Sequence, residues 1–237
     1  MQFLRSLLFT AYLMLAACLW GTFMTLCFWL PHRRQFALAR AWARSVLFLL
    51  DRLCGLKCSI EGREHIPAGA HIVMSNHTSA WETIALFTIF PPQVWVLKRE
   101  LLWIPFVGWG LKLLRPIAID RGAGHRAVTQ VVEQGQARLA DDLWVIIFPE
   151  GTRVVAGDSR KYGVSGALLS IASQRLIVPF SHNAGEFWAR RGILKKPGVV
   201  RAVIGKPISA AGKDARTLTE EVRVAIEAGR ARIAGTP

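Results

Sequence analysis

Two short segments of the chain carry residues whose types and spacing suit removal of a proton from an alcohol. The first, residues 76–82, reads Asn-His-Thr-Ser-Ala-Trp-Glu and places His77 five residues before Glu82. A neutral imidazole accepts a proton near pH 7 when an acceptor holds its other nitrogen. We therefore predict that His77 is a general base and that Glu82 orients it. Residues 79–82 also match a helix capping box, in which Glu82 bonds to the backbone, and both roles can coexist.

The second segment, residues 148–153, reads Phe-Pro-Glu-Gly-Thr-Arg and follows a strongly apolar run. Gly151 permits a tight turn, and the planar guanidinium of Arg153 suits a phosphate. Glu150 is expected either to accept a hydrogen bond from a substrate hydroxyl or to hold the backbone of its loop. A solvated turn with a surface ion pair is the alternative. Together the segments predict acyl transfer to an alcohol that carries a phosphate.

These two segments resemble the paired HxxxxD and FPEGTR signatures of the glycerophospholipid acyltransferases, and the likeness runs from Ile72 to Gly185. The resemblance implies that Glu150, Gly151, Thr152 and Arg153 bind the glycerol phosphate of an acceptor lipid. Glu82 departs from the Asp that is commoner in the family, and a different rotamer can absorb its extra methylene.

Two intermediate blocks add basic residues to the expected acceptor site. Residues 98–101 (Lys-Arg-Glu-Leu) and 117–121 (Ile-Ala-Ile-Asp-Arg) resemble the family's KxEL and (I/A)xxDR elements. The resemblance assigns Lys98 and Arg121 to the acceptor's phosphate. With Arg153, three cations would then match a dianion.

Further blocks bear on the acyl chain or on the core. Val178 and Pro179 resemble a short VPV element that is associated with acyl-chain placement. His182 has no partner visible in the sequence and is interpreted as structural or solvent-facing. The apolar block from Leu101 to Trp109 is either core or a membrane-facing entrance for an acyl chain, and both interpretations stay open.

Alternating strands and helices are needed to bring these residues together. The pattern predicts strands over residues 57–62, 71–75, 94–98, 116–120, 143–148, 176–181 and 199–205, and helices over 79–90, 104–114, 124–140, 166–174 and 215–234. This alternation indicates an α/β fold with a largely parallel or mixed sheet covered by helices. His77, Lys98, Arg121 and Glu150 would each lie at or just past the carboxyl end of a strand, where open sheets gather ligand-binding residues.

The first 55 residues indicate a membrane anchor. Residues 6–30 contain no charge and would form a helix of roughly 36 Å, enough to cross a hydrocarbon core. Residues 35–53 are predicted as a second, interfacial helix. The apolar run is too long for a signal peptide, and more apolar sequence follows its lipoprotein-like box at residues 15–18. We expect an anchor over 1–55 and a catalytic domain over 56–237; whether the first helix spans the bilayer or lies in one leaflet is open.

Charge sets the expected orientation and partners. The formal net charge is +14, and arginines 33, 34, 40 and 44 follow the apolar run. The positive-inside rule therefore places the catalytic domain on the cytoplasmic face, and the resemblance to bacterial enzymes implies the inner membrane. The dispersed arginines show no nucleic-acid signature, and anionic phospholipids, a phosphate substrate and an acidic acyl carrier explain the charge more simply.

Neither a metal nor another cofactor is expected. The cysteines suggest no disulfide framework, and a zinc site at Cys54 and Cys58 is less favoured than simple packing. By resemblance, an acyl-CoA or acyl-ACP donor would acylate the sn-2 hydroxyl of 1-acylglycerol-3-phosphate, giving phosphatidic acid. The alternatives are transfer to another lysolipid such as a lyso-ornithine lipid, a thioester or phospholipid hydrolase, and a non-catalytic membrane-binding module.

Overall fold

A computed structural model describes residues 1–158 and 160–235, apart from the side chain of Arg121. Within that part, the strands form one seven-stranded sheet in the order β1-β7-β6-β2-β5-β3-β4. They are β1 (Leu56–Glu61), β2 (Ile72–Ser75), β3 (Gln93–Lys98), β4 (Ile117–Ile119), β5 (Trp144–Ile147), β6 (Ile177–His182) and β7 (Gly198–Ile204).

The sheet is mixed, as predicted. β6 and β7 pair antiparallel, and every other neighbouring pair is parallel. Each predicted strand is present, with its ends shifted by no more than one residue. The central strands β2, β5 and β6 are buried along their whole length, which explains why they appear in the sequence as continuous apolar runs.

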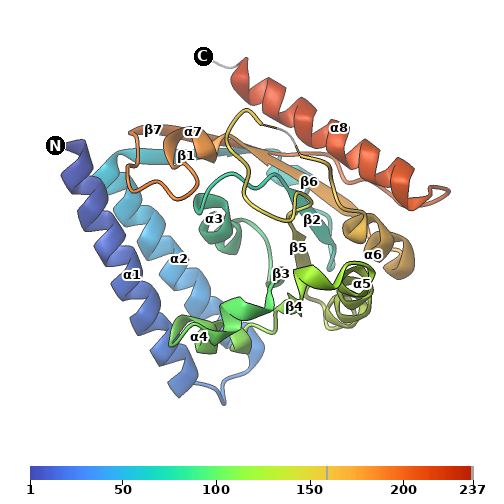
Figure 1. The fold of residues 1–237 in the computed structure, drawn as a ribbon, viewed down its shortest axis with the longest axis horizontal. Coiled ribbons are helices and arrows are strands. Elements are labelled where there is room, and N and C mark those ends of the chain that lie inside the picture. The colour runs from blue at the N-terminus through green and yellow to red at the C-terminus, as the bar shows by residue number, and fades with distance from the viewer. Residues whose placement is uncertain (159, 236–237) are drawn as a thin grey trace.

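Helices cover both faces of this sheet (Figure 1). One group, α1 (Gln2–Leu26), α2 (His32–Cys54), α3 (Trp81–Ile89) and α4 (Val107–Leu113), lies on one side. The other side carries α5 (His125–Ala140), α6 (Ser165–Ser173) and α8 (Ala215–Ala234). A short helix α7 (Ala184–Phe187), which the sequence pattern did not predict, follows β6 directly. Three 3-10 turns, η1 (Arg63–His65), η2 (Arg99–Trp103) and η3 (Arg121–Ala123), complete the description.

The boundaries expected for the first two helices are wrong. α1 ends at Leu26 rather than at residue 30, and α2 begins at His32 rather than at residue 35. Pro31 explains the break, because its extended backbone (ψ 144°) cannot continue a helix but suits the position just before a new one. Within the described chain, α1 passes the test of length and apolar character for a membrane span.

The second helix is also more buried than an interfacial helix would be. Its inner face packs into the same apolar core as the sheet, through residues such as Phe36, Val46 and Leu50. Arg40, which was expected near lipid headgroups, instead donates to the carbonyl oxygens of Phe87 (2.9 Å) and Phe90 (2.8 Å). The guanidinium therefore caps the carboxyl end of α3.

Candidate active site

The predicted pair of His77 and Glu82 forms at the carboxyl end of β2. His77 follows the strand by two residues, and Glu82 lies in the first turn of α3. The Nδ1 of His77 lies 2.8 Å from Oε1 of Glu82. Because a carboxylate accepts this bond, Nδ1 carries the proton in the neutral ring, and proton abstraction falls to Nε2. The His77 side chain is 12% exposed and the Glu82 side chain is fully buried.

Glu82 also bonds to the backbone, so the capping interpretation and the pairing with His77 hold together. Its Oε1 accepts the N–H groups of Thr78 (2.9 Å) and Ser79 (2.8 Å). The hydroxyl of Ser79 in turn accepts the N–H of Trp81 at 3.2 Å. Burial opposes the charge of Glu82, but the electrostatic effect of His182, the hydrogen bond and charge of His77, and the hydrogen bond from Ser79 outweigh it and hold the pKa of Glu82 below its usual range.

The loop at residues 148–153 packs directly on this pair. The Phe148 ring stacks on the His77 imidazole with centroids 3.9 Å apart, and the Val154 N–H donates to the carbonyl of His77 at 2.8 Å. Gly151 has φ of 69°, a left-handed conformation that favours glycine. The loop therefore fixes the ring plane of His77, and Thr152 lies half-buried within it.

Glu150 holds the backbone of its own loop, one of the two roles expected, and also that of His77. Its Oε1 accepts the N–H of His77 at 3.3 Å. The residue is 6% exposed, and burial raises the pKa of Glu150 to about 7 despite this hydrogen bond. A carboxyl group that is partly protonated at neutral pH thus lies beside the imidazole.

An apolar cavity of about 260 Å³ opens beside His77. His77 and Arg153 supply its charged or titratable lining, and the rest comes from residues such as Trp20, Trp42 and Leu111. Trp20 and Trp42 stack with centroids 5.3 Å apart where α1 meets α2. The Nε of Arg153 is buried without a partner in the described structure, and burial, more than nearby Arg190, lowers the pKa of Arg153. Glu82 opposes that shift, and a guanidinium with an unpartnered Nε beside a candidate base suits an anionic ligand.

The other two predicted cations lie farther along the same edge. Lys98 ends β3, is about half exposed, and pairs with Glu100 at 3.0 Å. Arg121 begins η3 just after β4, and its side chain lies outside the described part of the chain. Strands lie about 4.8 Å apart, so β3 and β4 are roughly 10 and 14 Å from β2. Of the two cations whose side chains are described, Arg153 lines the cavity with His77 and Lys98 does not.

The apolar blocks take two different positions. Val178 and Pro179 lie in the middle of β6, in register with Val73 and Met74 of β2, and do not line the cavity. The block from Leu101 to Trp109 forms η2 and the start of α4 beside α1, with Leu101 at the cavity wall and Trp103 67% exposed. It is therefore both cavity wall and outer surface.

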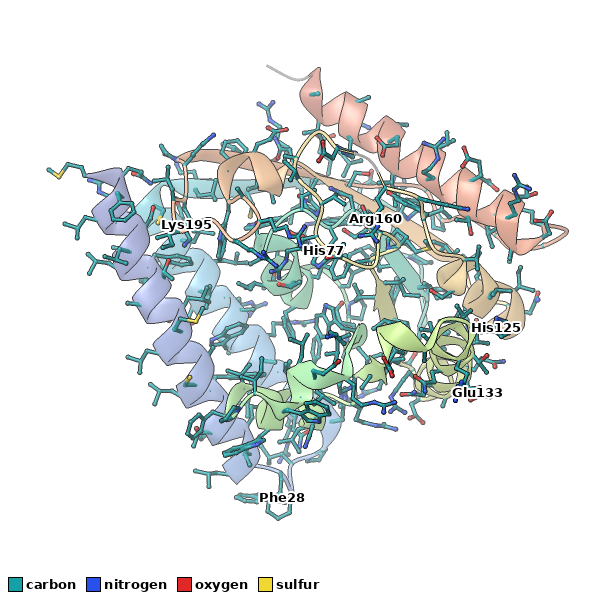
Figure 2. The ribbon with its side chains drawn as sticks, viewed as in Figure 1. Phe28, His77, His125, Glu133, Arg160 and Lys195 are labelled. Carbon is teal, nitrogen blue, oxygen red and sulfur yellow. The ribbon has the colours of Figure 1, made fainter. Side chains whose placement is uncertain are left out.

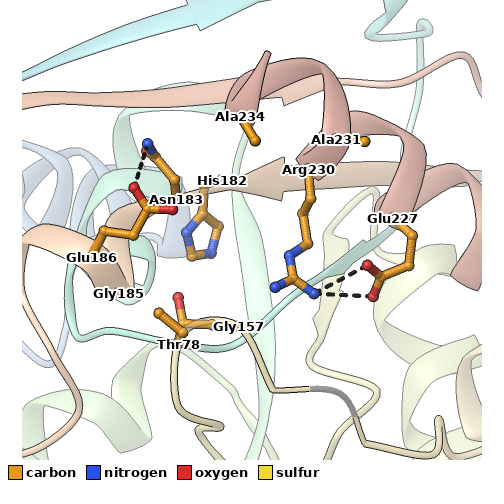
Figure 3. Close-up of a pocket in the computed structure, with 11 residues that line it drawn as sticks. Thr78, Gly157, His182, Asn183, Gly185, Glu186, Glu227, Arg230, Ala231 and Ala234 are labelled. Atoms are coloured by element: carbon orange, nitrogen blue, oxygen red, sulfur yellow. Dashed lines mark hydrogen bonds and ion pairs between the residues drawn. The ribbon is translucent and has the colours of Figure 1, made fainter. Parts of the chain in front are cut away.

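His182, expected to be structural or solvent-facing, is structural. It lies fully buried at the end of β6 and contacts Asn76, the residue before His77. It also lines a second cavity of about 290 Å³, between α7, α8 and the loop around Gly157 (Figure 3). Sequence gives no signal for this contact, because 106 residues separate the partners. Among the described residues, no cluster of His, Cys, Asp or Glu has the arrangement of a metal site.

The chain is similar to proteins of known family. A family model described as Acyltransferase matches residues 57–183. The 1-acyl-sn-glycerol-3-phosphate acyltransferase of Pseudomonas aeruginosa is 38% identical over 224 residues, which cover 92% of this chain and 86% of the relative. The human 1-acyl-sn-glycerol-3-phosphate acyltransferase alpha is 28% identical over 186 residues, covering 76% of this chain and 66% of the relative.

The fold has a solved counterpart as well. The crystal structure of the 1-acyl-sn-glycerophosphate acyltransferase PlsC from Thermotoga maritima superposes with a TM-score of 0.80 and 19% identity, covering 98% of this chain and 97% of the other. At that identity the likeness shows a shared fold. Taken with the matched family model and the relative from Pseudomonas aeruginosa, it shows that this chain belongs to the acyltransferase family.

Proposed function

We propose that this chain transfers a fatty acyl group from an acyl-CoA or acyl-ACP thioester to the sn-2 hydroxyl of 1-acylglycerol-3-phosphate, giving phosphatidic acid. The observation that carries the proposal is the His77 and Glu82 pair, which borders an apolar cavity together with Arg153. A base, a cation and an apolar space are the three parts needed to bind and acylate a lysolipid phosphate.

In the proposed reaction, Nε2 of His77 takes the proton of the sn-2 hydroxyl while the oxygen attacks the thioester carbonyl carbon. Glu82 stabilises the imidazolium that forms. Collapse of the tetrahedral intermediate breaks the bond between carbon and sulfur, and His77 returns the proton to the departing thiolate. The products are phosphatidic acid and the free donor thiol.

The acyl chain is assigned to the apolar cavity and the phosphate to Arg153. The cavity is lined by side chains of α1, α2, α3, β3 and α4, which suits a hydrocarbon chain. Lys98 and Arg121 complete the phosphate site from the neighbouring strand ends, with Glu150, Gly151 and Thr152 shaping the loop. Val178 and Pro179 support the site from the core.

Residues 1–55 are proposed to act as the membrane anchor of a catalytic domain over 56–237. α1 contacts that domain at both ends, since Gln2 donates to the carbonyl of Lys195 (2.6 Å) and Gly21 packs against Phe106. A helix held along its length by a polar domain cannot cross a bilayer alone. We therefore place α1 in one leaflet, with its outer face, Phe28 at its tip (Figure 2) and Trp103 in lipid.

Orientation follows from the arginines beside this tip. Arg33 and Arg34 suit the anionic phospholipids of the cytoplasmic face of a bacterial inner membrane, where the acyl donors would meet the enzyme. An acyl-ACP or acyl-CoA donor fits this side equally well.

The test is acyl transfer in mixed micelles with acyl-CoA and with acyl-ACP, offering lysophosphatidic acid or a lyso-ornithine lipid, followed by mass spectrometry of the products. Phosphatidic acid is the expected product. His77→Ala should lower turnover by about 10²- to 10⁴-fold. His125→Ala, an exposed histidine at the start of α5 (Figure 2), is the matched control and should behave like the wild type.

Three results would count against the proposal. Acylation of the lyso-ornithine lipid alone would replace the acceptor. Equal thiol release with and without acceptor would indicate a hydrolase. Retention of more than about a tenth of turnover in His77→Ala would remove His77 from the mechanism.

A further inference from the structure

His182 is joined to the residue that precedes His77 by three hydrogen bonds. The Asn76 side chain donates to the carbonyl of His182 and accepts its N–H, both at 3.0 Å. These two bonds extend the ladder between β2 and β6 beyond its last backbone pair, Ser75 and Phe180. The third runs from Nε2 of the His182 ring to the carbonyl of Asn76 at 2.8 Å. The backbone leading into His77 is therefore held by a neighbouring strand.

The hydrogen bonds of the His182 ring fix its tautomer. Nδ1 accepts the N–H of Ala184 at 3.2 Å, so the proton of the neutral ring lies on Nε2. Burial lowers the pKa of His182 and keeps the ring neutral near pH 7. Figure 3 shows this ring pointing from β6 toward Thr78, with Arg230 of α8 across the pocket.

The Nε2–H of His182 also lies beside Oε2, the second carboxylate oxygen of Glu82. The Oε1 of Glu82 takes all three of its close hydrogen bonds, while Oε2 is buried with none in the described structure. His182 Nε2 lies 3.8 Å from that oxygen, too long for a hydrogen bond but close enough for its dipole to act in a buried site.

We infer that His182 is a positioning residue for the reaction: its Nε2–H holds the Asn76 carbonyl and faces the Glu82 carboxylate, which keeps His77 aligned and Glu82 ionised. This inference rests on the proposed role of His77 as the base. His182 itself touches no reacting atom.

Other charged groups also act on the pair and must be held constant in any test. Glu150 and Arg153 approach Glu82 from the loop after β5, and Arg230 approaches His182 from α8, where it pairs with Glu227 at 3.1 Å. All of them stay in place when only residue 182 is changed.

The test compares His182→Phe with His182→Gln. Phe keeps the ring shape and both backbone bonds to Asn76 but removes the Nε2 donor. Gln can place an amide N–H near the position of Nε2. We expect Phe to lower kcat by about 10- to 100-fold with little change in KM, as small misplacements of a base do. The acid limb of its kcat profile should also move to higher pH, because the coupled pair of His77 and Glu82 binds a proton more readily when the carboxylate is less stabilised.

His182→Gln should keep a kcat and an acid limb close to those of the wild type. Equal impairment of Phe and Gln, or a Phe variant with the wild-type profile, would overturn the inference. Should the Phe variant fail to fold, His182→Asn serves instead, because its shorter side chain also lacks a donor at Nε2. An Asn variant with the kcat and pH profile of the Gln variant would equally overturn it.

A His77→Ala background separates this inference from the proposed function. There, His182→Phe should cause no further loss of residual activity, since it acts through His77. A full additional loss would overturn the positioning role while leaving the base in place. Activity retained in His77→Ala alone would instead refute the proposed function.

Discussion

Two buried glutamates lie beside His77, and their pKa values are shifted in opposite directions. Glu82 receives three N–H groups at 2.8 to 2.9 Å, and its pKa falls below the usual range despite complete burial. Glu150 is nearly as buried but receives the N–H of His77 at 3.3 Å, and burial raises its pKa to about 7. The electrostatic effect of His182, together with the number and length of donated hydrogen bonds, separates the two carboxylates, because burial alone raises the pKa of both.

The largest expected effect comes from removing the charge of Glu82. Glu82→Gln keeps an oxygen that can accept the N–H groups of Thr78 and Ser79 but cannot stabilise an imidazolium. We expect turnover to fall by about 10²- to 10⁴-fold while the melting temperature barely moves. Steady-state kinetics and thermal denaturation of the same preparation check this. Full turnover would show that the pairing with His77 has no catalytic role.

Arg153 should give the next largest effect. Removing a half-buried guanidinium from the cavity should weaken acceptor use by about 10- to 150-fold, or roughly 1.5 to 3 kcal/mol, with donor KM unchanged. Arg160→Ala, in an exposed part of the chain, is the matched control.

Lys98→Ala should weaken acceptor use less than Arg153→Ala does, because Lys98 is half exposed and pairs with Glu100. Unchanged acceptor KM in variants of Arg153, Lys98 and Arg121 would contradict the phosphate site.

Glu150 should make the free energy of unfolding depend on pH. Its pKa is higher in the folded protein than the usual 4.5, so it contributes stability that is full below pH 4.5 and is lost as pH rises through about 7. Between pH 5 and 8 this loss amounts to about 2 kcal/mol. Glu150→Gln stands in for the neutral form, and its denaturation curves should flatten over that range. Glu82→Gln should not flatten them there, since Glu82 titrates at lower pH. A Glu150 variant with the wild-type slope would refute the contrast.

The smallest effect is expected at Ser79. Ser79→Ala loses the bond to the N–H of Trp81 but leaves Glu82 in place, so stability should fall by about 1 kcal/mol with activity within about twofold. Chemical denaturation and the transfer assay measure the two quantities. A large activity loss would mean that the cap and the catalytic pair cannot be separated.

The local parts of the site could be predicted from sequence. His77 and Glu82 lie within one loop and one helical turn, so their contact follows from spacing alone. The strand ends could be predicted too, because β2 and β5 are short apolar runs between polar turns. The ends of α1 could not be read from hydropathy, because the apolar character continues through residues 27–30 after the helix stops.

Contacts between distant segments could not be predicted. His182 meets Asn76 across 106 residues, and the cavity joins Trp20, Trp42 and Leu111 from three separate helices. Arg40 resembled a headgroup arginine because it belongs to the arginines that follow the apolar run, yet its partners Phe87 and Phe90 lie at the carboxyl end of α3. Such contacts form only when the elements pack together. They leave no regular spacing in the sequence from which they could be predicted.

One face of the helix α1 lines the cavity, and the opposite face is exposed. Ala17 and Trp20 line the cavity, while Leu15 and Leu19 are about 60% exposed on the opposite side, toward the proposed lipid. The enzyme would thus draw its acceptor sideways from the bilayer, without release into water. Its relevant substrate concentration is then a mole fraction in the membrane, and turnover should fall when inert lipid dilutes the acceptor at constant bulk concentration. Bilayer thickness and fluidity would then affect the cavity through α1, because this helix contacts both the lipid and the cavity.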